Sequence, residues 1–188
     1  MINLSVIIPF YYGKPGKVDK LAQCIASLGD EPDEILVIGN TSAGLPWSLN
    51  KGLRTASGNF LLIISDDMIL TEGNLEELCK WNFVTHPLVD GQPQIFGGCV
   101  CYPRHIYEKV GNYDENFIQG YYDDDDYFIR VAKAGYERQV ISSVNMYHDD
   151  PGHTLRSLVT SEMMEHNKQY LMQKWGESCK TPFPSKIL

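Results

Sequence analysis

Two adjacent carboxylates, Asp66 and Asp67, follow an apolar run at residues 60–64 and are spaced closely enough to do chemistry together. A single aspartate after Ser65 would suffice as a turn residue or a helix cap. Two neighbouring carboxylates repel each other unless a cation or a hydrogen-bond donor compensates them. Mg²⁺ and Mn²⁺ are commonly held by one or two carboxylates together with substrate phosphates. The pair therefore predicts either a polar turn or a divalent-metal site.

A second acidic run, residues 123–126, consists of four consecutive aspartates. Acidic residues stabilise the first turn of a helix by only ~0.3–1 kcal/mol each, and every further one adds repulsion. Like-charge neighbours also raise the pKa of a carboxylate and make it a better proton acceptor. Because Tyr127 and Phe128 follow at once, we expect the core to anchor this helix start. The run predicts an acidic helix start or a catalytic base.

Three further polar or flexible residues each have two interpretations. His148 ends a predicted strand and is followed by Asp149 and Asp150. A histidine there is most often a hydrogen-bonded structural residue, but beside two carboxylates it is also a candidate metal ligand. Asn50 and Gly52 are typical of a helix start and a turn. Their amide and backbone groups could also contact a nucleotide.

Alternating strands and helices must position these residues. Near-continuous apolar runs predict buried strands at residues 4–10, 34–38 and 59–64. Apolar residues at helical spacing predict helices at residues 19–28 and 47–57. In a parallel βαβαβ arrangement the carboxyl ends of the strands meet at one edge of the sheet, where ligands bind. The residues delivered to that edge are Pro9, Phe10, Tyr11, Gly39, Asn40, Ser65, Asp66 and Asp67.

The second half of the chain adds strands and helices to the same α/β pattern. We expect a helix over residues 75–84, a strand over 94–102 and a short helix over 104–110. Longer helices are predicted over 124–134 and 154–175. The predicted fold class is α/β, a mostly parallel central sheet flanked by helices and followed by a C-terminal helix.

Composition excludes several classes of protein. The chain has 188 residues and a net charge of −8, and this acidic balance argues against binding to a nucleic-acid backbone. No stretch approaches the ~20 apolar residues of a membrane span, and the N-terminus lacks the features of a secretion signal. We therefore expect a soluble, cytoplasmic protein. The five cysteines are odd in number and lack zinc-site spacing, so we expect buried free thiols.

Taken together, these motifs resemble the family 2 glycosyltransferases, whose fold is called GT-A. The similarity begins at SVIIPFYY, continues through EILVIGNTS, and is most specific over residues 50–67, which resemble the stretch leading into the family's Asp-x-Asp motif. Residues 98–115 are similar to the acceptor-side segment, and residues 122–130 look like the acidic start of the catalytic helix. Residues 146–148 are similar to the metal-binding strand of animal galactosyltransferases.

The resemblance implies one GT-A, Rossmann-like domain over residues 1–176, followed by a tail at 177–188. Residues 1–67 are then expected to form the nucleotide-binding half, 94–153 the acceptor and catalytic half, and 154–176 the C-terminal helix. The chain is short for the family. A second copy in a homo-oligomer could therefore complete the acceptor region.

The same resemblance implies an inverting transfer of a sugar from a nucleotide-diphosphate sugar, expected to be a UDP-sugar, to a carbohydrate or other hydroxyl acceptor. By this resemblance Asp124 is the catalytic base, and Asp67 and His148 hold the cofactor, Mn²⁺ or Mg²⁺. The implied substrate-binding residues are Pro9, Phe10, Tyr11, Asn40, Asn50, Gly52, Ser65, Asp66, Gly98, Asp123 and Asp125.

Two departures from the family pattern leave other functions open. Asn40 stands where an aspartate that contacts uracil is common, and Ser65 replaces the first aspartate of Asp-x-Asp. The second departure favours a catalytically inactive module that binds sugar nucleotides. Lys14, Gly16 and Lys17 suggest the triphosphate-binding loop of a nucleotidyltransferase, which is the other alternative.

Overall fold

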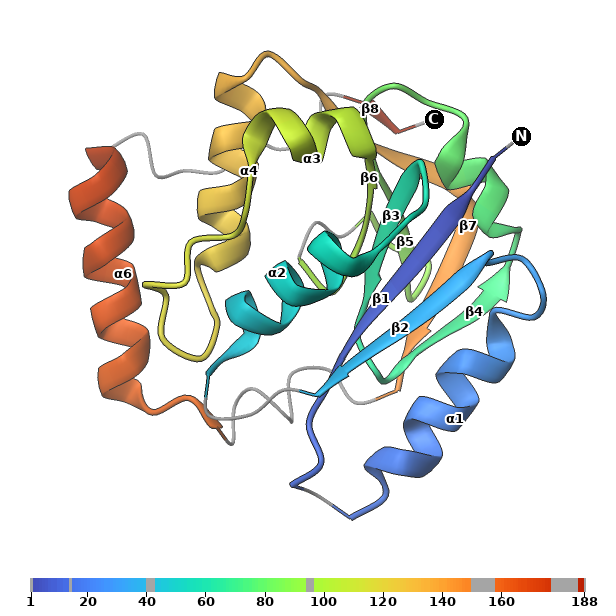
Figure 1. The fold of residues 1–188 in the computed structure, drawn as a ribbon, viewed down its shortest axis with the longest axis horizontal. Helices are drawn as coiled ribbons and strands as arrows, with labels where there is room; N and C mark the ends of the chain where they lie inside the picture. The colour runs from blue at the N-terminus through green and yellow to red at the C-terminus, as the bar shows by residue number, and fades with distance from the viewer. Residues whose placement is uncertain are drawn as a thin grey trace.

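Residues 4–64 form the βαβαβ unit that their apolar runs predict (Figure 1). Its elements in the computed structural model are β1 (Leu4–Phe10), α1 (Lys17–Ser27), β2 (Glu34–Gly39), α2 (Leu45–Thr55) and β3 (Phe60–Ile64). Strands β2 and β3 both pair with β1 in parallel. The structure describes residues 2–13, 15–39, 43–93, 97–149, 158–176 and 186–187.

The rest of the chain extends the sheet beyond β3. Its elements are β4 (Met68–Glu72), the 3₁₀ turn η1 (Leu75–Cys79), β5 (Val84–Val89), β6 (Cys99–Pro103), α3 (Arg104–Val110), α4 (Asp123–Lys133), β7 (Arg138–His148), α6 (Ser161–Trp175) and β8 (Lys186–Ile187). The strand order is β2-β1-β3-β6-β5-β7-β4, with β8 beside β7. Strands β5 and β8 run parallel to β7, while β6 runs antiparallel to β3 and β5, and β4 antiparallel to β7. The predicted α/β class is confirmed, with antiparallel pairings that the sequence did not indicate.

Apolar side chains alternate along the strands, so the sheet has a core on each face. On β1, Leu4, Val6 and Ile8 belong to the cluster that includes residues of α1 and η1. Ile7 points the other way, into the cluster that includes residues of α2, α3 and α4. Helix α2 approaches β1 closely at Gly52, because a Cβ there would clash with the side chain of Ile7. The two cores hold the strand ends, and hence the site, in a defined arrangement.

Helix α6 lies at the far side of the molecule from the sheet, beyond α4 (Figure 1). Leu171 of α6 and Phe117 belong to a third apolar cluster. Asp126 of α4 is fully buried, accepts a hydrogen bond of 2.8 Å from Nε1 of Trp175 and lies 2.7 Å from Nζ of Lys174. Apolar and charged contacts thus attach α6 to the rest of the fold. None of the helices in the described part of the chain is long and apolar enough to cross a membrane.

The helix predicted over residues 75–84 is wrong. Residues Leu75 and Leu78 are buried, as a helical stripe would be, but the helical segment is the short turn η1. Val84 then begins β5, because tertiary pairing with β6 and β7 overrides the local helical pattern. Strand β4 was not predicted either, since it is held by long-range pairing with β7.

One helix near the C-terminus begins later than expected. Helix α6 begins at Ser161, where the side chain of Thr160 caps it by accepting from the backbone N–H of Met163 at 3.3 Å. Residues 150–157, with which the predicted helix overlaps, lie outside the described residues. Within the predicted tail, Lys186–Ile187 form β8 and pair with β7.

The prediction of buried free thiols is confirmed for the described cysteines. Cys24, Cys79, Cys99 and Cys101 are all buried and unbridged. Burial raises the pKa of the Cys24 thiol to about 12, and Asp66 adds to this effect. The Cys24 thiol is therefore protonated and unreactive at neutral pH. Cys179 lies outside the described residues.

Candidate active site

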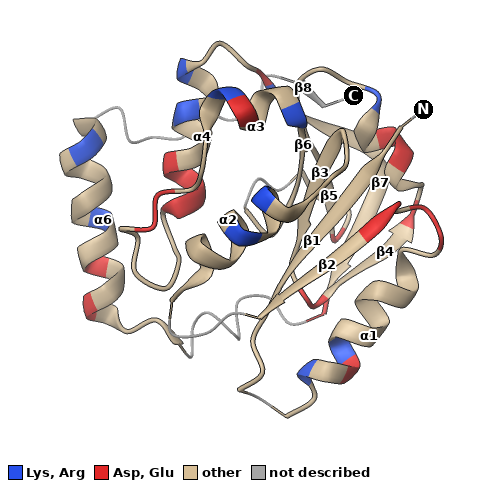
Figure 2. Ribbon diagram, in the orientation of Figure 1, with Lys and Arg blue, Asp and Glu red and all other residues tan. Residues whose placement is uncertain are grey.

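A cavity of about 310 Å³ lies at the carboxyl ends of β1 and β3. Pro9 and Tyr11 line it from the end of β1, and residues 65–67 from the end of β3. Asp123 and Asp124 line it from the start of α4, where acidic residues gather (Figure 2). The other lining residues are Leu45, Leu49, Ile63, Gly97, Gly98, Tyr113, Tyr121, His148 and Leu158. Two acidic runs that lie far apart in the sequence thus share one cavity.

Lys17 bridges the two carboxylates that follow β3. Its Nζ lies 3.0 Å from Oδ1 of Asp66 and 3.2 Å from Oδ2 of Asp67. The lysine is the first residue of α1 and is only 3% exposed. The start of α1 therefore delivers a buried positive charge to the site. Such a position is unusual, because lysine is almost never buried unless it is paired.

Burial and charge act on these three groups in opposite directions. Burial lowers the pKa of Lys17, but Asp67 and Asp66 outweigh it and raise that pKa above its usual value. Burial raises the pKa of Asp66, and Lys17 offsets this only in part. Burial also raises the pKa of Asp67, but His148 and Lys17 outweigh it and hold that pKa below its usual value. Asp67 is therefore the carboxylate that stays ionised more readily.

The antiparallel pairing of β4 with β7 brings His148 next to Asp67. His148 stands opposite Met68 in the register of the two strands. The backbone N–H of Asp149 donates to the carbonyl of Asp67 at 3.0 Å. Nε2 of His148 lies 3.2 Å from Oδ1 of Asp67. The structure thus places the two predicted metal ligands side by side, through a strand that the sequence did not reveal.

The antiparallel pairing of β6 with β3 places two glycines between the acidic runs. The backbone N–H of Ser65 donates to the carbonyl of Gly98 at 2.8 Å. The backbone N–H of Gly97 donates to Oδ2 of Asp124 at 2.9 Å. The end of β3 and the start of α4 are therefore connected by a short backbone segment. Gly98, one of the predicted substrate-binding residues, lines the cavity.

The four aspartates at the start of α4 have different surroundings. Burial raises the pKa of Asp123 well above its usual value, and Asp124 adds to this. Burial, and then Asp125, raise the pKa of Asp124. Asp126 points into the core, where Nε of Arg130 lies 2.9 Å from its Oδ2. Asp123 and Asp124 line the cavity, whereas Asp125 is not among its lining residues.

The segment before α4 has an unusual backbone conformation that α6 supports. Three of its residues lie in the left-handed region that non-glycine residues seldom adopt: Gln119 (φ 62°), Tyr121 (φ 66°) and Tyr122 (φ 67°). Asn167 of α6 is fully buried beside them, and its Oδ1 accepts from the backbone N–H of Ile118 at 2.9 Å. Its Nδ2 donates to the carbonyls of Ile118 and Gly120 at 3.0 and 2.7 Å. The segment leads directly into the acidic start of α4.

Besides Asp125, three predicted substrate-binding residues do not line the cavity, and another is not described. Phe10 is 2% exposed and does not line the cavity. The side chain of Asn50 is buried, accepts from the backbone N–H of Tyr113 at 2.7 Å and donates to the carbonyl of Tyr113 at 2.9 Å. Gly52 serves the packing of α2 on the sheet. Asn40 lies outside the described residues.

Among the lining residues that the sequence did not single out are Gly97, Tyr113 and Tyr121. Lys17, which the sequence suggested only as part of a triphosphate-binding loop, instead pairs with Asp66 and Asp67. Tyr113 stacks on Tyr127 at 4.1 Å between ring centroids. Its hydroxyl also lies 2.9 Å from that of Tyr102. The glycine pair was an available signal, since adjacent glycines inside a strand pattern mark a close backbone approach. Nothing in the local sequence indicates that Lys17 is buried.

Asp66, Asp67 and His148 offer carboxylate oxygens and an imidazole nitrogen, which are types of donor atom that hold divalent cations. Oδ2 of Asp66 and Oδ1 of Asp67 are buried and make no hydrogen bond, although Nε2 of His148 is close to the latter. Carboxylate and imidazole groups suit Mn²⁺, and carboxylates suit Mg²⁺. Within the described ranges, no group of three His, Cys, Asp or Glu side chains could hold an ion by itself. An ion here would need oxygens from a substrate to complete its coordination.

Two solved structures of similar architecture are glycosyltransferases. The catalytic domain of Drosophila beta1,4-galactosyltransferase 7, solved with xylobiose, is similar with a TM-score of 0.67 and 13% identity over 89% of this chain and 80% of that chain. GalNAc-T7, solved with UDP, GalNAc and Mn²⁺, is similar with a TM-score of 0.73 and 13% identity over 96% of this chain and 49% of that chain. The fold is GT-A.

The GT-A prediction is therefore confirmed at the level of the fold. The chain spans about half the length of the GalNAc-T7 chain, because the match covers 49% of that chain. No protein-family model matches the sequence, and no curated protein matches it. Because one GT-A fold can carry different activities, what this chain does has to be argued from its own site.

Proposed function

We propose that the chain is an inverting glycosyltransferase that moves a sugar from a nucleotide-diphosphate sugar, preferably a UDP-sugar, to a hydroxyl acceptor. The observation that carries this proposal is the placement of Asp67 and Asp124 on the lining of one cavity at the carboxyl edge of a GT-A sheet. One carboxylate lies next to a histidine and a lysine, and the other has a raised pKa. Asp67 can thus stabilise charge on one wall of the cavity, while Asp124 can accept a proton on another.

The donor binds along the wall made by β1 and β3. Pro9 and Tyr11 contact the nucleoside, and the ring of Tyr11 is available to stack on the base. Asp67 and His148 would hold Mn²⁺ or Mg²⁺, which would neutralise the charge that grows on the departing diphosphate. Two structural neighbours support this choice of ligand, because one was solved with UDP and Mn²⁺ and the other is a galactosyltransferase.

Asp124 is the general base. Its carboxylate takes the proton of the acceptor hydroxyl while that oxygen forms a bond to the anomeric carbon. The bond from the anomeric carbon to the β-phosphate oxygen breaks on the opposite side, the nucleoside diphosphate leaves with the bonding electrons, and the anomeric configuration inverts. The hydrogen bond from Gly97 holds one oxygen of Asp124 in place for this step.

Asp123 orients a hydroxyl group and does not carry the proton. Its pKa is raised well above the usual value by burial and by the neighbouring Asp124. A carboxyl group held neutral in this way can donate a hydrogen bond as well as accept one. We assign it to a hydroxyl of the donor or acceptor sugar, beside the base.

Two alternative functions are less well supported by the site. A nucleotidyltransferase needs free basic groups for a triphosphate, whereas Lys17 is engaged by Asp66 and Asp67. A catalytically inactive binding module is favoured only by Ser65 in place of an aspartate. Ser65 lines the cavity and its backbone N–H pairs with Gly98, so the position has a structural role without a carboxylate.

The experiment that tests the proposal is a thermal-shift screen of nucleotide sugars with and without Mn²⁺, followed by product analysis. A ligand that binds only the folded chain raises its Tm, by an amount set by ligand concentration and Kd. We expect a UDP-sugar with Mn²⁺ to raise Tm and UDP to be released on addition of an acceptor, or slowly to water. Release of pyrophosphate from a nucleoside triphosphate would favour a nucleotidyltransferase, and binding without any UDP release would favour the inactive module.

A further inference from the structure

The most unusual group at the site is the ammonium of Lys17. Figure 1 shows α1 running alongside the sheet, with its first turn near the end at which β1, β2 and β3 finish. Lys17 opens this helix directly after Gly16, whose φ of 77° is readily adopted only by glycine. The backbone turn therefore aims the first side chain of the helix inward. As a result Lys17 is 3% exposed, whereas Val18 beside it is 66% exposed.

The ammonium occupies the space between the two carboxylates and leaves one oxygen of each without a hydrogen bond. Nζ contacts Oδ1 of Asp66 at 3.0 Å and Oδ2 of Asp67 at 3.2 Å. The other two oxygens, Oδ2 of Asp66 and Oδ1 of Asp67, are buried and have no hydrogen-bond partner. Oδ1 of Asp67 is the one that lies near Nε2 of His148. The oxygen of Asp67 that Lys17 leaves uncontacted is therefore the one on the histidine side.

The charges at this point determine how strongly the free protein attracts an ion. Asp66 and Asp67 together carry −2 when ionised, and Lys17 reduces this to −1 at contact distance. The neighbouring Lys20 and Asp149 form an ion pair of their own at 3.0 Å and contribute no net charge. A positive charge a few ångströms from a divalent ion opposes its binding strongly in a partly buried site.

We propose that Lys17 is a tethered counter-cation that keeps the affinity of the free protein for divalent ions low, so that the ion is retained only together with the nucleotide diphosphate. This inference rests on the function proposed above. The phosphates add the negative charge that Lys17 has removed from the site, and they supply the oxygens that the protein lacks. In the metal-free protein, Lys17 also prevents the two carboxylates from repelling each other.

The test is a titration of the full chain and of K17M with Mn²⁺ alone. Electron paramagnetic resonance measures the concentration of free Mn²⁺ at each step. Methionine fills a similar volume without the charge. We expect K17M to bind Mn²⁺ roughly tenfold or more tightly than the unmodified chain in the absence of nucleotide. K17R keeps the charge and should stay as weak as the unmodified chain. The matched control K20M removes a charge from the same helix without touching Asp66 or Asp67, and should change the affinity much less than K17M.

A second measurement needs no variant and covers the case in which K17M does not fold. In the unmodified chain, UDP should strengthen Mn²⁺ binding by roughly tenfold or more, because its phosphates add negative charge and oxygen ligands. By reciprocity, Mn²⁺ should strengthen UDP binding by the same factor. Tight Mn²⁺ binding without UDP, or unchanged Mn²⁺ affinity in a folded K17M, would overturn the role of Lys17. If K17M binds Mn²⁺ more tightly but the unmodified chain turns over no sugar nucleotide, the inference about Lys17 stands and the glycosyltransferase proposal fails.

Discussion

The backbone N–H of Gly97 donates a hydrogen bond of 2.9 Å to Oδ2 of Asp124. The contact is possible because residue 97 has no side chain: a Cβ there would lie 2.8 Å from Cβ of Asp124, closer than real Cβ contacts come. The other oxygen of Asp124, Oδ1, accepts from the backbone N–H of Asp125 at 3.0 Å. Both oxygens of the proposed base are therefore oriented by backbone donors.

Gly97→Ala is expected to displace Asp124 and to lower turnover while leaving donor binding nearly intact. The methyl group must push the carboxylate or the β6 backbone aside, and a misplacement of about 1 Å can cost ~10²-fold in rate. Steady-state kinetics should show a fall in kcat, and calorimetry should show an unchanged Kd for UDP with Mn²⁺. A variant with wild-type kcat would mean that the position of Asp124 is unimportant.

Asp124→Asn is expected to cut turnover by ~10²-fold or more, the usual scale for the loss of a general base. In the unmodified chain, burial and Asp125 raise the pKa of Asp124 above that of an ordinary aspartate. A base works only when deprotonated, so kcat/KM should fall as pH is lowered through this raised pKa. The variant should lose that limb of the profile. Asp30→Asn, at an exposed carboxylate, should keep both the rate and the profile.

The position of the first acidic run follows from local pattern and topology. Buried apolar strands followed by polar residues predict a parallel βαβαβ unit, and such a unit brings the ends of β1 and β3 to one edge. Asp66 and Asp67 therefore could be predicted at the edge of the sheet, where the structure has them. The acidic start of α4 was likewise visible as four aspartates before Tyr127, which is buried.

The remaining parts of the site depend on long-range pairing that the sequence pattern does not show. His148 reaches Asp67 through the antiparallel pairing of β4 with β7, and β4 has little alternation of its own. Gly97 reaches Asp124 only because β6 pairs with β3. The burial of Lys17 could not be predicted because a lysine is exposed by default, and its burial requires carboxylates from a distant segment. Asn50 looked like a nucleotide contact but holds the backbone of Tyr113.

Asn167→Ala is expected to destabilise the chain and to lower activity at the same time. Asn167 is fully buried, and its amide holds the backbone of residues 118–121 before α4. Its loss leaves several buried polar groups unpaired, at a cost of roughly 2–4 kcal/mol, which corresponds to about 4–16 °C in Tm for a chain of this length. The strained left-handed residues there also lose their support.

Asn167→Asp provides the comparison for this position. Aspartate keeps the volume and the oxygen that accepts from Ile118, but loses the donors to the carbonyls of Ile118 and Gly120. It should therefore be destabilised as well, whereas an exposed change on the same helix, such as Gln169→Ala, should leave Tm nearly unchanged. Calorimetric melting and the rate of UDP release measure both effects. Normal activity in a folded Asn167→Ala would show that the segment needs no support from α6.

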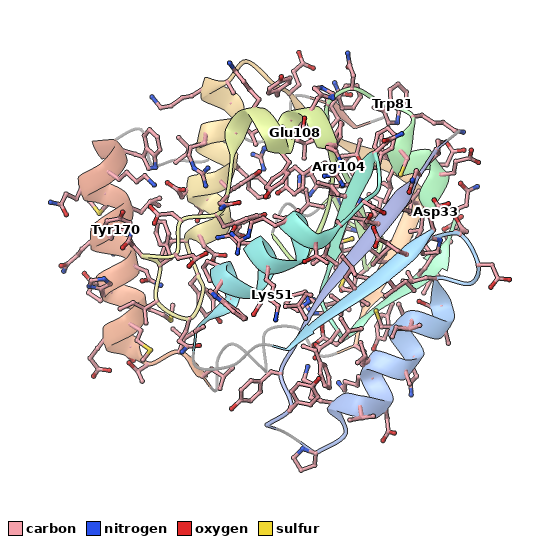
Figure 3. All side chains as sticks on the ribbon, in the orientation of Figure 1. Asp33, Lys51, Trp81, Arg104, Glu108 and Tyr170 are labelled. Atoms are coloured by element: carbon pink, nitrogen blue, oxygen red, sulfur yellow. The ribbon has the colours of Figure 1, made fainter. Side chains whose placement is uncertain are left out.

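Asp114→Asn is expected to weaken the attachment of α6 and to reduce the acid sensitivity of the fold. Asp114 contacts Nζ of Lys174 at 2.6 Å and accepts from the hydroxyl of Tyr170, labelled on α6 in Figure 3, at 3.0 Å. Burial raises the pKa of Asp114, but Lys174 and Asn116 outweigh it and lower that pKa to about 2.

Since the pKa of Asp114 is lower in the folded chain than in the unfolded one, its ionised form stabilises the fold at neutral pH. That contribution is present above the ordinary aspartate pKa of ~4 and is lost as pH falls toward ~2. At pH 7, Asp114→Asn should therefore lower Tm, by about 2–8 °C for a loss of ~1–2 kcal/mol. Between about pH 4 and pH 2 the difference in Tm between the variant and the unmodified chain should shrink. A difference in Tm that stays constant over this range would mean that the charge of Asp114 does not hold α6 in place.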